Sequence, residues 1–434
     1  MALLGHGSLR MMHQILRNAT QGHESSAEEA KIGGMDIKIE GARIWDGESH
    51  ESSKSPVSIW ISDGKIQSVG VDPGVSAQVV IACPEGSVVI PGLIDAHIHM
   101  DLDPMILKPQ GQFEVSRDDR DLRMIARAAA MVRAGITTAR DLGGGEWREL
   151  ALRDAILREE HPGPRLLCVG QPLTVPKGHC HFWGGAAQNE RERSKVIQRQ
   201  LDHEVDWIKV MATGGVFTPG SGVDRAQFSA GEIAEMVKLA ENGGKSVAAH
   251  CHGREGIQNA ARGGVRTIEH CTFAGQGGFG VDYDPGVVQE IAAQQAWVSP
   301  TINGNWQRRL VSEGEPTDFH RRTRAVLAGL RGAGVPLIAS TDAGIPGVRH
   351  HTLWTGLVAM SHYAALSPRE TLESATSESA RALGLENVCG LVKQGLSADL
   401  LILSGDPLLD LGQLAEPLWV LARGRVARRP EVSA

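Results

Sequence analysis

Two histidines two residues apart, His97 and His99, are residues whose type and spacing could do chemistry. They end an apolar, β-branched run, and residues two apart on a β-strand point to the same face. Two neutral imidazoles on one face can hold one divalent metal ion. Because histidine pairs also occur as hydrogen-bonded surface residues, the motif alone leaves both interpretations open.

Further apolar runs end in side chains of the kinds that bind metals. Lys209 stands inside the run 207–211, and a buried lysine is costly unless it is paired or chemically altered. His250 and His270 each end a later run, and Asp342 follows the run 336–341. The alternative is a set of hydrogen-bonded polar residues at strand ends, but so many metal-type side chains in equivalent places favour a metal site.

The chain between these residues supplies the elements that could bring them together. Short β-branched runs alternate with helix-like stretches such as 118–133 and 254–262. This alternation predicts an α/β fold, a (β/α)8 TIM barrel with a parallel sheet, over residues 88–394. Barrel enzymes carry their chemistry at the C-terminal ends of the strands, where these side chains stand. The predicted barrel runs are 88–98, 135–141, 165–173, 207–212, 246–250, 267–272, 296–302 and 336–341.

Both ends of the chain carry short β runs of another kind. Residues 35–87 alternate apolar and polar positions and contain a hairpin signal at Asp63-Gly64, and residues 395–434 repeat the pattern. Neither segment has enough strands to bury a core alone. We therefore predict one small β-sandwich domain built from both chain ends. Residues 1–34 are predicted to be a leader of unknown structure.

Composition narrows the class of protein. The 434 residues include 44 basic and 51 acidic side chains, a net charge of −7, which gives no electrostatic footprint for nucleic acid or an anionic membrane. No apolar stretch approaches the 18 residues or so that span a bilayer. Six cysteines without a CxxC motif indicate reduced thiols. We expect a cytoplasmic homo-oligomer that acts on a small-molecule substrate.

The order of these residues resembles the amidohydrolase superfamily, in particular its binuclear members with a carboxylated lysine. HxH on the first strand is followed by Lys on the fourth, His on the fifth and sixth, and Asp on the eighth. The segments IKVMATGG at 208–215, IEH at 268–270 and STDAG at 340–344 are most similar to the imidazolonepropionase-like and prolidase-like branch. That branch includes Xaa-Pro dipeptidases and hydrolases of phenylureas and other xenobiotic amides.

The resemblance implies two divalent metal ions, with zinc first and cobalt or manganese as alternatives, because N/O ligands suit all three. It also implies CO2 bound to Lys209 as a carbamate, which turns a repelling ammonium into an anionic oxygen ligand. The implied ligands are His97, His99 and Asp342 for the more buried ion, His250 and His270 for the more exposed ion, and Lys209 as a bridge.

The activity implied is hydrolysis of a C–N bond in an amide, urea or carbamate by a metal-bridging hydroxide. Asp342 would take the proton of the attacking hydroxide and pass it to the leaving nitrogen. Alternatives are an Xaa-Pro or N-acyl amino acid dipeptidase, a cyclic-amide hydrolase, a lactonase and a phosphotriesterase. A non-catalytic scaffold is the alternative from another class.

Three residues are candidates for contact with substrate. His179 follows the third strand and resembles a family histidine that contacts substrate. His252 lies two beyond His250 and therefore faces the same side. Arg225 could bind a substrate carboxylate. The alternative, which is more common for an arginine in such a loop, is a solvated side chain without a role in binding.

The aromatic residues bear on the kind of substrate. Related dipeptidases often carry a tyrosine near position 228, where this chain has Phe228 without a hydroxyl. Together with Trp183 and Trp354 on predicted loops, Phe228 indicates an apolar pocket. We therefore rank neutral aryl amides, ureas or carbamates slightly ahead of dipeptides. Cys251 and Cys271 adjoin predicted ligands but should point away from them, into the packing around the barrel.

Overall fold

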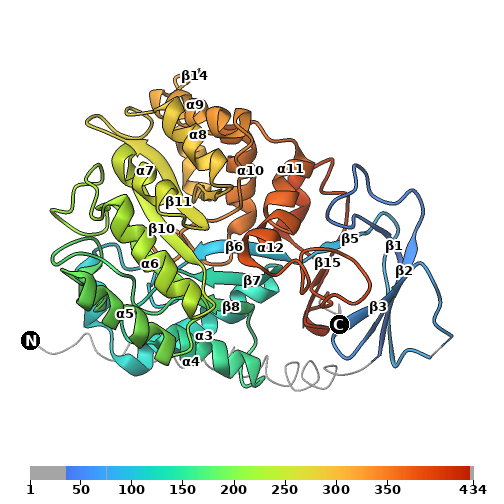
Figure 1. Ribbon diagram of the computed structural model, residues 1–434. Helices are drawn as coiled ribbons and strands as arrows, with labels where there is room; N and C mark the ends of the chain where they lie inside the picture. The colour runs from blue at the N-terminus through green and yellow to red at the C-terminus, as the bar shows by residue number, and fades with distance from the viewer. Residues whose placement is uncertain (1–35, 75, 431–434) are drawn as a thin grey trace, which may run out of the picture.

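The structure is a computed structural model that describes residues 36–74 and 76–430. The predicted leader, residues 1–34, lies outside the described residues. Within them, strands and helices alternate along the chain, as the sequence predicts for an α/β protein (Figure 1). None of the described helices combines the length and the apolar character that crossing a membrane requires.

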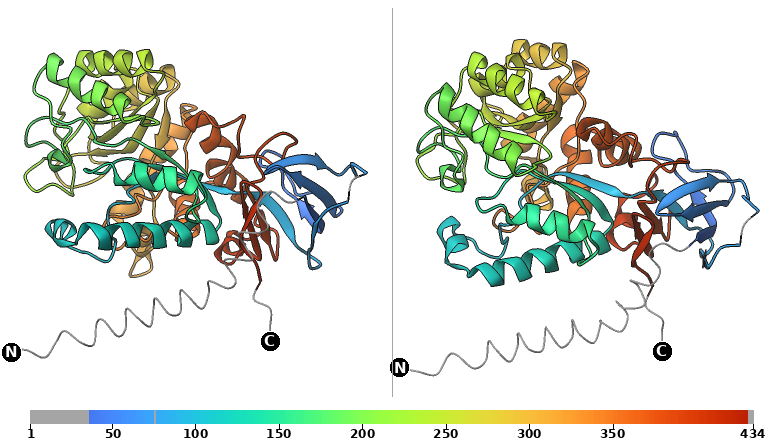
Figure 2. Two further views of the ribbon diagram at one scale, coloured as in Figure 1. Left: turned by 90° about the horizontal axis from the view of Figure 1, so that it is seen from below. Right: turned by 60° about the horizontal axis from the view of Figure 1, so that its bottom comes forward.

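The two ends of the chain meet in one eight-stranded sheet, which stands beside the helix-rich part of the molecule (Figures 1 and 2). Its order is β17-β16-β15-β5-β1-β2-β3, with β4 paired in parallel to β1. The hairpin expected at Asp63-Gly64 joins β2 to β3. The strands are β1 (Ile37–Ile44), β2 (Val57–Ser62), β3 (Lys65–Val69), β4 (Val79–Ala82), β5 (Val88–Pro91), β15 (Leu400–Leu403), β16 (Trp419–Ala422) and β17 (Arg425–Arg428).

The run 88–98, predicted to be one strand, is two strands divided at Gly92. β5 pairs with β15 and β1 in the sheet of the chain ends, whereas the next strand, from Leu93, pairs elsewhere. A Cβ atom on Gly92 would lie 2.1 Å from Oγ1 of Thr137. Only a residue without a side chain fits where the backbone passes from one sheet to the other.

Seven further strands form two parallel sheets, ordered β6-β7-β8 and β12-β11-β10-β9. They correspond to seven of the eight predicted barrel runs. They are β6 (Leu93–Ile98), β7 (Ile136–Asp141), β8 (Arg165–Cys168), β9 (Ile208–Met211), β10 (Val247–Gly253), β11 (Thr267–Ala274) and β12 (Trp297–Ser299). A short hairpin, β13 (Val311–Ser312) and β14 (Glu315–Pro316), stands apart from both.

These strands do not form the single closed sheet that the sequence predicts. The eighth run, 336–341, contains one bridge residue and no strand. The N–H of Ala339 donates to the carbonyl of Ser374 rather than to a neighbouring strand, which interrupts the ladder. Single parallel bridges still link the sheets and this run; they pair Leu173 with Val210, Val298 with Leu337, and Ile98 with Ala343.

Helices follow most of the parallel strands and cover their outer side (Figure 1). Local sequence sets their starts: Ser229 and Glu232 form a capping box at α6, and Ser367 and Glu370 form another at α11. The α-helices are α3 (Arg117–Arg133), α4 (Arg148–Leu157), α5 (Glu190–Asp202), α6 (Ala230–Asn242), α7 (Arg254–Arg262), α8 (Pro285–Ala293), α9 (Asp318–Gly332), α10 (Leu353–Ala364), α11 (Pro368–Ser374) and α12 (Ser377–Leu383). The 3-10 helices are η2 (Pro109–Glu114), η3 (His181–Trp183), η4 (Gly304–Arg309) and η5 (Leu411–Ala415).

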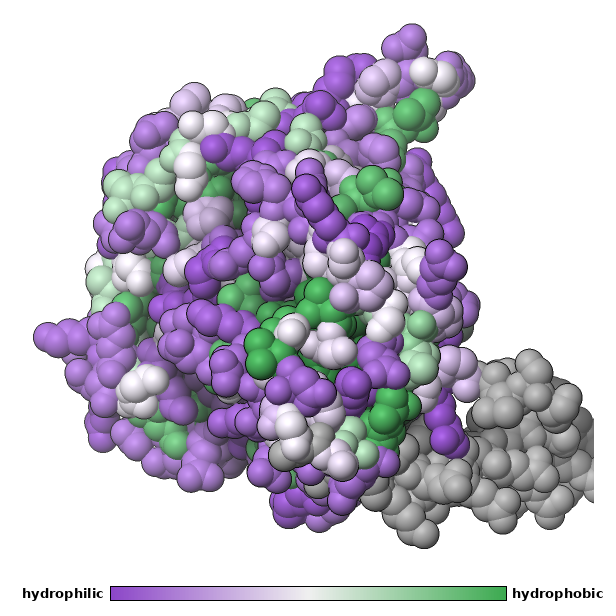
Figure 3. Space-filling model, turned by 90° about the vertical axis from the view of Figure 1, so that its right-hand side faces the viewer, coloured by the Kyte–Doolittle hydropathy of each residue, from purple (hydrophilic) through white to green (hydrophobic). Residues whose placement is uncertain are grey.

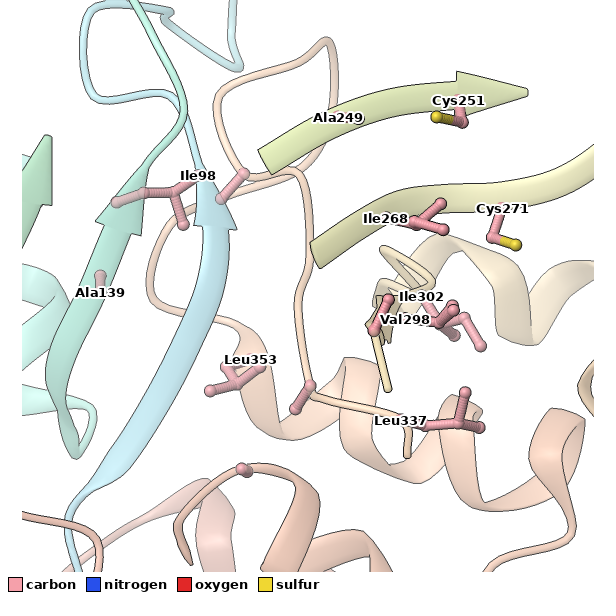
Figure 4. Close-up of a cluster of buried hydrophobic side chains, with 14 of the residues drawn as sticks. Ile98, Ala139, Ala249, Cys251, Ile268, Cys271, Val298, Ile302, Leu337 and Leu353 are labelled. Atoms are coloured by element: carbon pink, nitrogen blue, oxygen red, sulfur yellow. The ribbon is translucent and has the colours of Figure 1, made fainter. Parts of the chain in front are cut away.

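The main core lies between the parallel strands and their helices. Figure 4 shows Ile98 and Ala139 on one parallel sheet near Ile268 and Val298 of the other, with Leu353 at the start of α10. A separate cluster of buried isoleucines and leucines fills the sheet of the chain ends. The face that carries this sheet is mostly hydrophilic, with hydrophobic residues in patches between the hydrophilic ones (Figure 3).

Candidate metal centre

The ends of the parallel strands open into one cavity of about 580 Å³. The polar residues that the sequence places at strand ends share this cavity, although they are up to 245 positions apart in the chain. Those that line it are His97, His99, His179, Lys209, His250, His252, His270 and Asp342. The structure thus brings together every predicted ligand and two of the three predicted substrate contacts.

His97 and His99 leave β6 toward the same carboxylate. Their Nε2 atoms lie 3.4 Å and 3.3 Å from Oδ1 of Asp342. Nδ1 of His99 donates to the carbonyl of Gly143, and Nδ1 of His97 donates to Glu269, both at 2.9 Å. When the second ring nitrogen is bonded in this way, the tautomer is fixed and Nε2 is the nitrogen that can bind a metal.

His250, His252 and His270 form a second group. One ring nitrogen of each lies within 4.8 Å of the others, and His97, His270 and Asp342 meet the same criterion. Nε2 of His250 donates to the carbonyl of Gly214 at 3.0 Å, so Nδ1 is the nitrogen available to an ion. Burial lowers the pKa of all three imidazoles, which keeps them in the neutral form that binds metals.

The amine of Lys209 is buried among these rings. No group among the described residues accepts a hydrogen bond from its Nζ atom. Burial lowers the pKa of Lys209 to about 8, which raises the share of neutral amine, the form that can add to CO2. An unpartnered buried amine among imidazoles fits a carbamate ligand better than an ammonium, because an ammonium would repel a metal ion.

Asp342 is a partly buried carboxylate held by the backbone of its neighbours. Its N–H donates to the carbonyl of His97 at 2.8 Å. The hydroxyl of the preceding Thr341 donates to Asp95 at 2.6 Å, which fixes this turn against β6. Burial works against ionisation, but His97 and His99 lower the pKa of Asp342 to about 2. The group is therefore ionised at neutral pH and can bind a cation or accept a proton.

Three residues at these strand ends have a strained backbone. His270, Thr301 and Asp342 have φ values of +66°, +53° and +60°, in the left-handed region that favours glycine. Nδ1 of His270 lies 2.9 Å from Oγ1 of Thr301, so two strained residues orient each other. Strain of this kind is characteristic of sites where geometry serves function.

Behind the ligands lies a buried ion pair that the sequence does not reveal. Arg140 and Glu269 are both fully buried and joined at 2.8 Å, and the second oxygen of Glu269 bonds His97. Burial opposes ionisation of Glu269, but the charge of Arg140 holds its pKa well below the usual range. Arg140 also donates to the carbonyl of Ala96 and stacks on Trp207. The IEH motif includes Glu269, but nothing in it indicates the partner Arg140.

The two other histidines of the cavity, His179 and His252, each have a ring nitrogen within hydrogen-bonding distance of a threonine hydroxyl. Nδ1 of His179 lies 3.1 Å from Thr218 Oγ1, and its ring packs on His250 with centroids 4.5 Å apart. A Cβ atom on Gly215 would lie 2.4 Å from this ring, so the close approach requires glycine. Nδ1 of His252 lies 2.9 Å from Thr272 Oγ1. Both side chains line the cavity.

Arg225 lies outside the cavity. It is exposed, and the cavity is lined instead by Arg309 from η4. The signal that could have found Arg309 is its place shortly after the seventh predicted barrel run, where barrel enzymes carry functional residues.

The aromatic lining also differs in part from the expectation. Trp183 lines the cavity as predicted, but Phe228 and Trp354 pack against the core. Phe228 precedes the cap of α6, the position whose side chain packs against the first turns of a helix in a hydrophobic staple. The missing hydroxyl at 228 therefore says nothing about substrate. The aromatic residues that sequence reasoning missed are Phe217, Phe279 and Trp306.

The cysteines beside the ligands behave as predicted. Cys251 and Cys271 are buried in the hydrophobic core, and Figure 4 shows them among apolar side chains. Burial raises the pKa of both thiols far above the usual range. Neither thiol lines the cavity; the cysteine that does is Cys180, whose thiol has its pKa raised well above the usual range by burial.

The donor set fits a metal centre of the kind that the resemblance implies. Four imidazoles each have one nitrogen bonded to the protein and one left for an ion, and Asp342 is ionised. The amine of Lys209 has no hydrogen-bond partner in the part of the chain that the structure describes. Neutral imidazole and carboxylate are the usual ligands of Zn²⁺ and similar ions.

Comparisons with known proteins agree with this arrangement. Ochratoxinase of Aspergillus niger is 24% identical over 363 residues, which cover 76% of this chain and 73% of that protein. The crystal structure of an Xaa-Pro dipeptidase with bound methionine superposes with a TM-score of 0.79 at 25% identity, covering 90% of this chain and 99% of the other. Phenylurea hydrolase B shares the fold, with a TM-score of 0.75 at 20% identity and coverage of 90% and 96%.

The family follows from a match along most of the chain. The sequence profile described as "Amidohydrolase family" matches residues 88–426, from β5 to β17. That family consists of metal-dependent hydrolases, and related members act on C–N bonds. The chain is a hydrolase that belongs to the amidohydrolase family.

Proposed function

We propose that the protein is a binuclear metal-dependent hydrolase that cleaves a C–N bond of a small amide, urea or carbamate. The observation that carries the proposal is the buried, unpartnered amine of Lys209 in one cavity with the histidines and Asp342. A scaffold without activity has no need of a buried lysine beside an ionised aspartate.

The ligand assignment follows the resemblance to the binuclear members of the family, and the ring nitrogens left free on the four histidines are compatible with it. The residues that would hold two divalent ions are His97, His99 and Asp342 for one, His250 and His270 for the other, and carboxylated Lys209 for both. Zinc is the first candidate, and cobalt and manganese suit the same donors. When bound, such ions activate water and polarise a carbonyl.

Hydrolysis places the oxygen of water on the carbonyl carbon, breaks the C–N bond and moves one proton from water to the leaving nitrogen. Asp342 is the group proposed to carry that proton, because it is ionised at neutral pH. It is also the only Asp or Glu among the described residues that line the cavity. Its bond to the backbone of His97 keeps its position fixed during the transfer.

The walls of the cavity favour a substrate with an aromatic or large apolar group. Trp183, Phe217, Phe279 and Trp306 line it, and apolar walls with a few polar groups are typical of small-molecule sites. His179 and His252 are the proposed polar contacts. The names of ochratoxinase, Xaa-Pro dipeptidase and phenylurea hydrolase B are consistent with this range of substrates.

A second candidate is hydrolysis of an Xaa-Pro dipeptide or another N-acyl amino acid. It is favoured by one observation, the presence of Arg309 on the wall of the cavity, because such substrates carry a carboxylate.

The finer architecture is part of the proposal. The bridges of Leu337 and Ala343 support the run 336–341 as the eighth strand of a (β/α)8 barrel over residues 88–394. Residues 35–87 and 395–434 would form the β-sandwich domain. A cytoplasmic location and a homo-oligomeric state stay predictions.

The test combines metal analysis with a hydrolysis screen. We expect two divalent ions per chain and metal-dependent cleavage within a set of N-acyl amino acids, Xaa-Pro dipeptides and phenylureas. His270→Asn should lose both metal and activity, whereas His161→Asn, a control outside the cavity, should lose neither. Full activity without metal would refute the proposal, and a metal-loaded protein inactive on every class would favour a scaffold.

A further inference from the structure

A row of rings in contact with one another begins at His252 in the wall of the cavity; Phe279 and Trp306 of this row line the cavity, whereas Phe319 does not. The ring of His252 stacks on Phe279, with centroids 5.3 Å apart and planes at 15°. Phe279 packs against Phe319 at 6.1 Å, and Phe319 packs edge to face on Trp306 at 5.0 Å. These contacts extend the site from the proposed ligands toward η4.

Arg309 stands at the outer end of this row. Its guanidinium carbon lies 4.3 Å from the ring centroid of Phe319, which holds the cation by its charge and its flat face. No ion pair joins Arg309 to a carboxylate within residues 36–74 and 76–430. The side chain of Arg309 is exposed and lines the cavity, and its N–H donors form no ion pair with an acidic group of the described residues.

The backbone around Arg309 is fixed. The hydroxyl of Tyr363 donates to the carbonyl of Trp306 at 3.0 Å. The hydroxyl of Thr317 donates to the carbonyl of Arg309 itself. Because these bonds fix the backbone of η4 and the ring of Phe319 supports the guanidinium, less of Arg309 has to be ordered when a ligand arrives, and this lowers the entropic cost of binding.

The charge around the cavity favours an anion at this place. Lys209 lies among the proposed ligands, and its carbamate would carry no positive charge, so Arg309 is the remaining permanent cation among the described lining residues. An arginine held on an aromatic face presents a planar pair of donors that matches a carboxylate.

We infer that Arg309 is a specificity-determining residue that binds a carboxylate of the substrate, and that the preferred substrates are N-acyl amino acids with an aromatic or large apolar group. The inference rests on the proposed function, because it assumes C–N cleavage at the metal centre. It reverses the order expected from the sequence, in which neutral aryl compounds come first, and it places the cation at 309 instead of 225.

The test compares a matched pair of substrates, N-benzoyl-L-phenylalanine and its C-terminal amide, by release of benzoate from the metal-loaded enzyme. We expect Arg309→Ala to lower kcat/KM for the acid by about 10–100-fold, mainly through KM, since a charge-assisted hydrogen bond is lost. The amide should change by less than about threefold, within the scatter of surface substitutions. Arg309→Lys should lie between, and Arg308→Ala, an exposed neighbour that does not line the cavity, should match the wild type.

Two outcomes would overturn the inference: an unchanged preference for the acid in Arg309→Ala, or an equal loss for acid and amide. A binding measurement tests the role of Arg309 separately from the proposed function. Calorimetry with 3-phenylpropanoate and 3-phenylpropanamide needs no turnover, and Arg309→Ala should weaken only the carboxylate. If the wild type cleaves no C–N bond, the proposed function fails, while this measurement still decides the role of Arg309.

Discussion

Glu269 accepts a hydrogen bond of 2.9 Å from Nδ1 of His97, and this contact connects the metal centre to the fully buried interior. The second oxygen of Glu269 bonds Arg140 at 2.8 Å, and Arg140 reaches back to the carbonyl of Ala96, next to His97. The side chains of His97, Glu269 and Arg140 therefore form a closed ring of hydrogen bonds with the backbone of β6. Within this ring Glu269 and Arg140 are positioning residues that orient a proposed ligand.

The first prediction concerns Glu269→Gln. The amide can still accept a bond from His97, but it leaves Arg140 buried without a counter-charge. We expect metal affinity to fall by about 10–100-fold, as for other partners of metal-binding histidines. The free energy of unfolding should fall by about 3–5 kcal/mol, the usual cost of breaking a buried ion pair. Metal titration and denaturant unfolding measure the two effects.

The matched control is Glu290→Gln, which breaks an ion pair with Arg262 on the outer helices. It should change stability by no more than about 1 kcal/mol, as is usual for exposed pairs, and metal affinity not at all. Equal metal affinity in both variants would show that Glu269 does not orient His97.

The second prediction concerns the bridge. Lys209→Ala should lose metal and activity, and small carboxylic acids such as acetate should restore part of both, because they can supply the missing oxygen ligand. Lys238→Ala, an exposed lysine on α6, should behave as the wild type. The carbamate proposal would be wrong if the protein bound two metals and had full activity while Lys209 remained an unmodified ammonium.

The third prediction concerns the thiols. Burial raises the pKa of Cys83 to about 11, and Cys83 is the only half-buried cysteine, the others being fully buried. The thiolate is the reactive form, so the rate of alkylation should rise with pH, toward a plateau above pH 11 or so. At pH 8 about one thiol in a thousand is ionised on this basis. Labelling should therefore be slow and confined to Cys83.

Cys83→Ser should abolish this labelling and leave hydrolysis unchanged. Rapid inactivation of the enzyme by a thiol reagent at pH 7 would instead point to a reactive cysteine in the site, namely Cys180, and would contradict the raised pKa that burial gives this thiol.

The strand ends could be predicted from the sequence because side chains two apart share a face. That rule places His97 with His99, and the rule that barrel enzymes carry their chemistry at the C-terminal ends of the strands places His250 and His270 in the same cavity. The division at Gly92 has a local signal, because Pro91-Gly92 is a dipeptide that marks turns. Its structural reason could not be predicted, since it is the close approach of Thr137, more than 40 positions away.

Loop residues were harder to place. No motif marks Arg309, because its role depends on how η4 folds over the seventh strand. Phe228 was misplaced although a signal was present: Ser229 and Glu232 form a capping box directly after it, and a hydrophobic residue before such a box packs against the helix. The burial of Arg140 could not be predicted for another reason. A charged residue within a strand is expected to be exposed unless a buried partner, here Glu269, is known.

The last prediction separates binding from chemistry at Asp342. Asp342→Asn keeps an oxygen for a metal but cannot accept a proton at neutral pH. We expect kcat to fall by about 10²–10⁴-fold, the range for general acid–base catalysis, and metal content to fall much less. The low pKa of the carboxyl, about 2, sets the sign of the pH dependence: activity that needs the ionised form is retained at neutral pH and lost only as the pH falls toward that value. Kinetics and metal analysis on the same preparation measure both effects, with Asp282→Asn, an exposed aspartate outside the cavity, as control. If Asp342→Asn keeps a near wild-type kcat, the carboxylate is a ligand alone, and another group in the cavity, such as His179, must carry the proton.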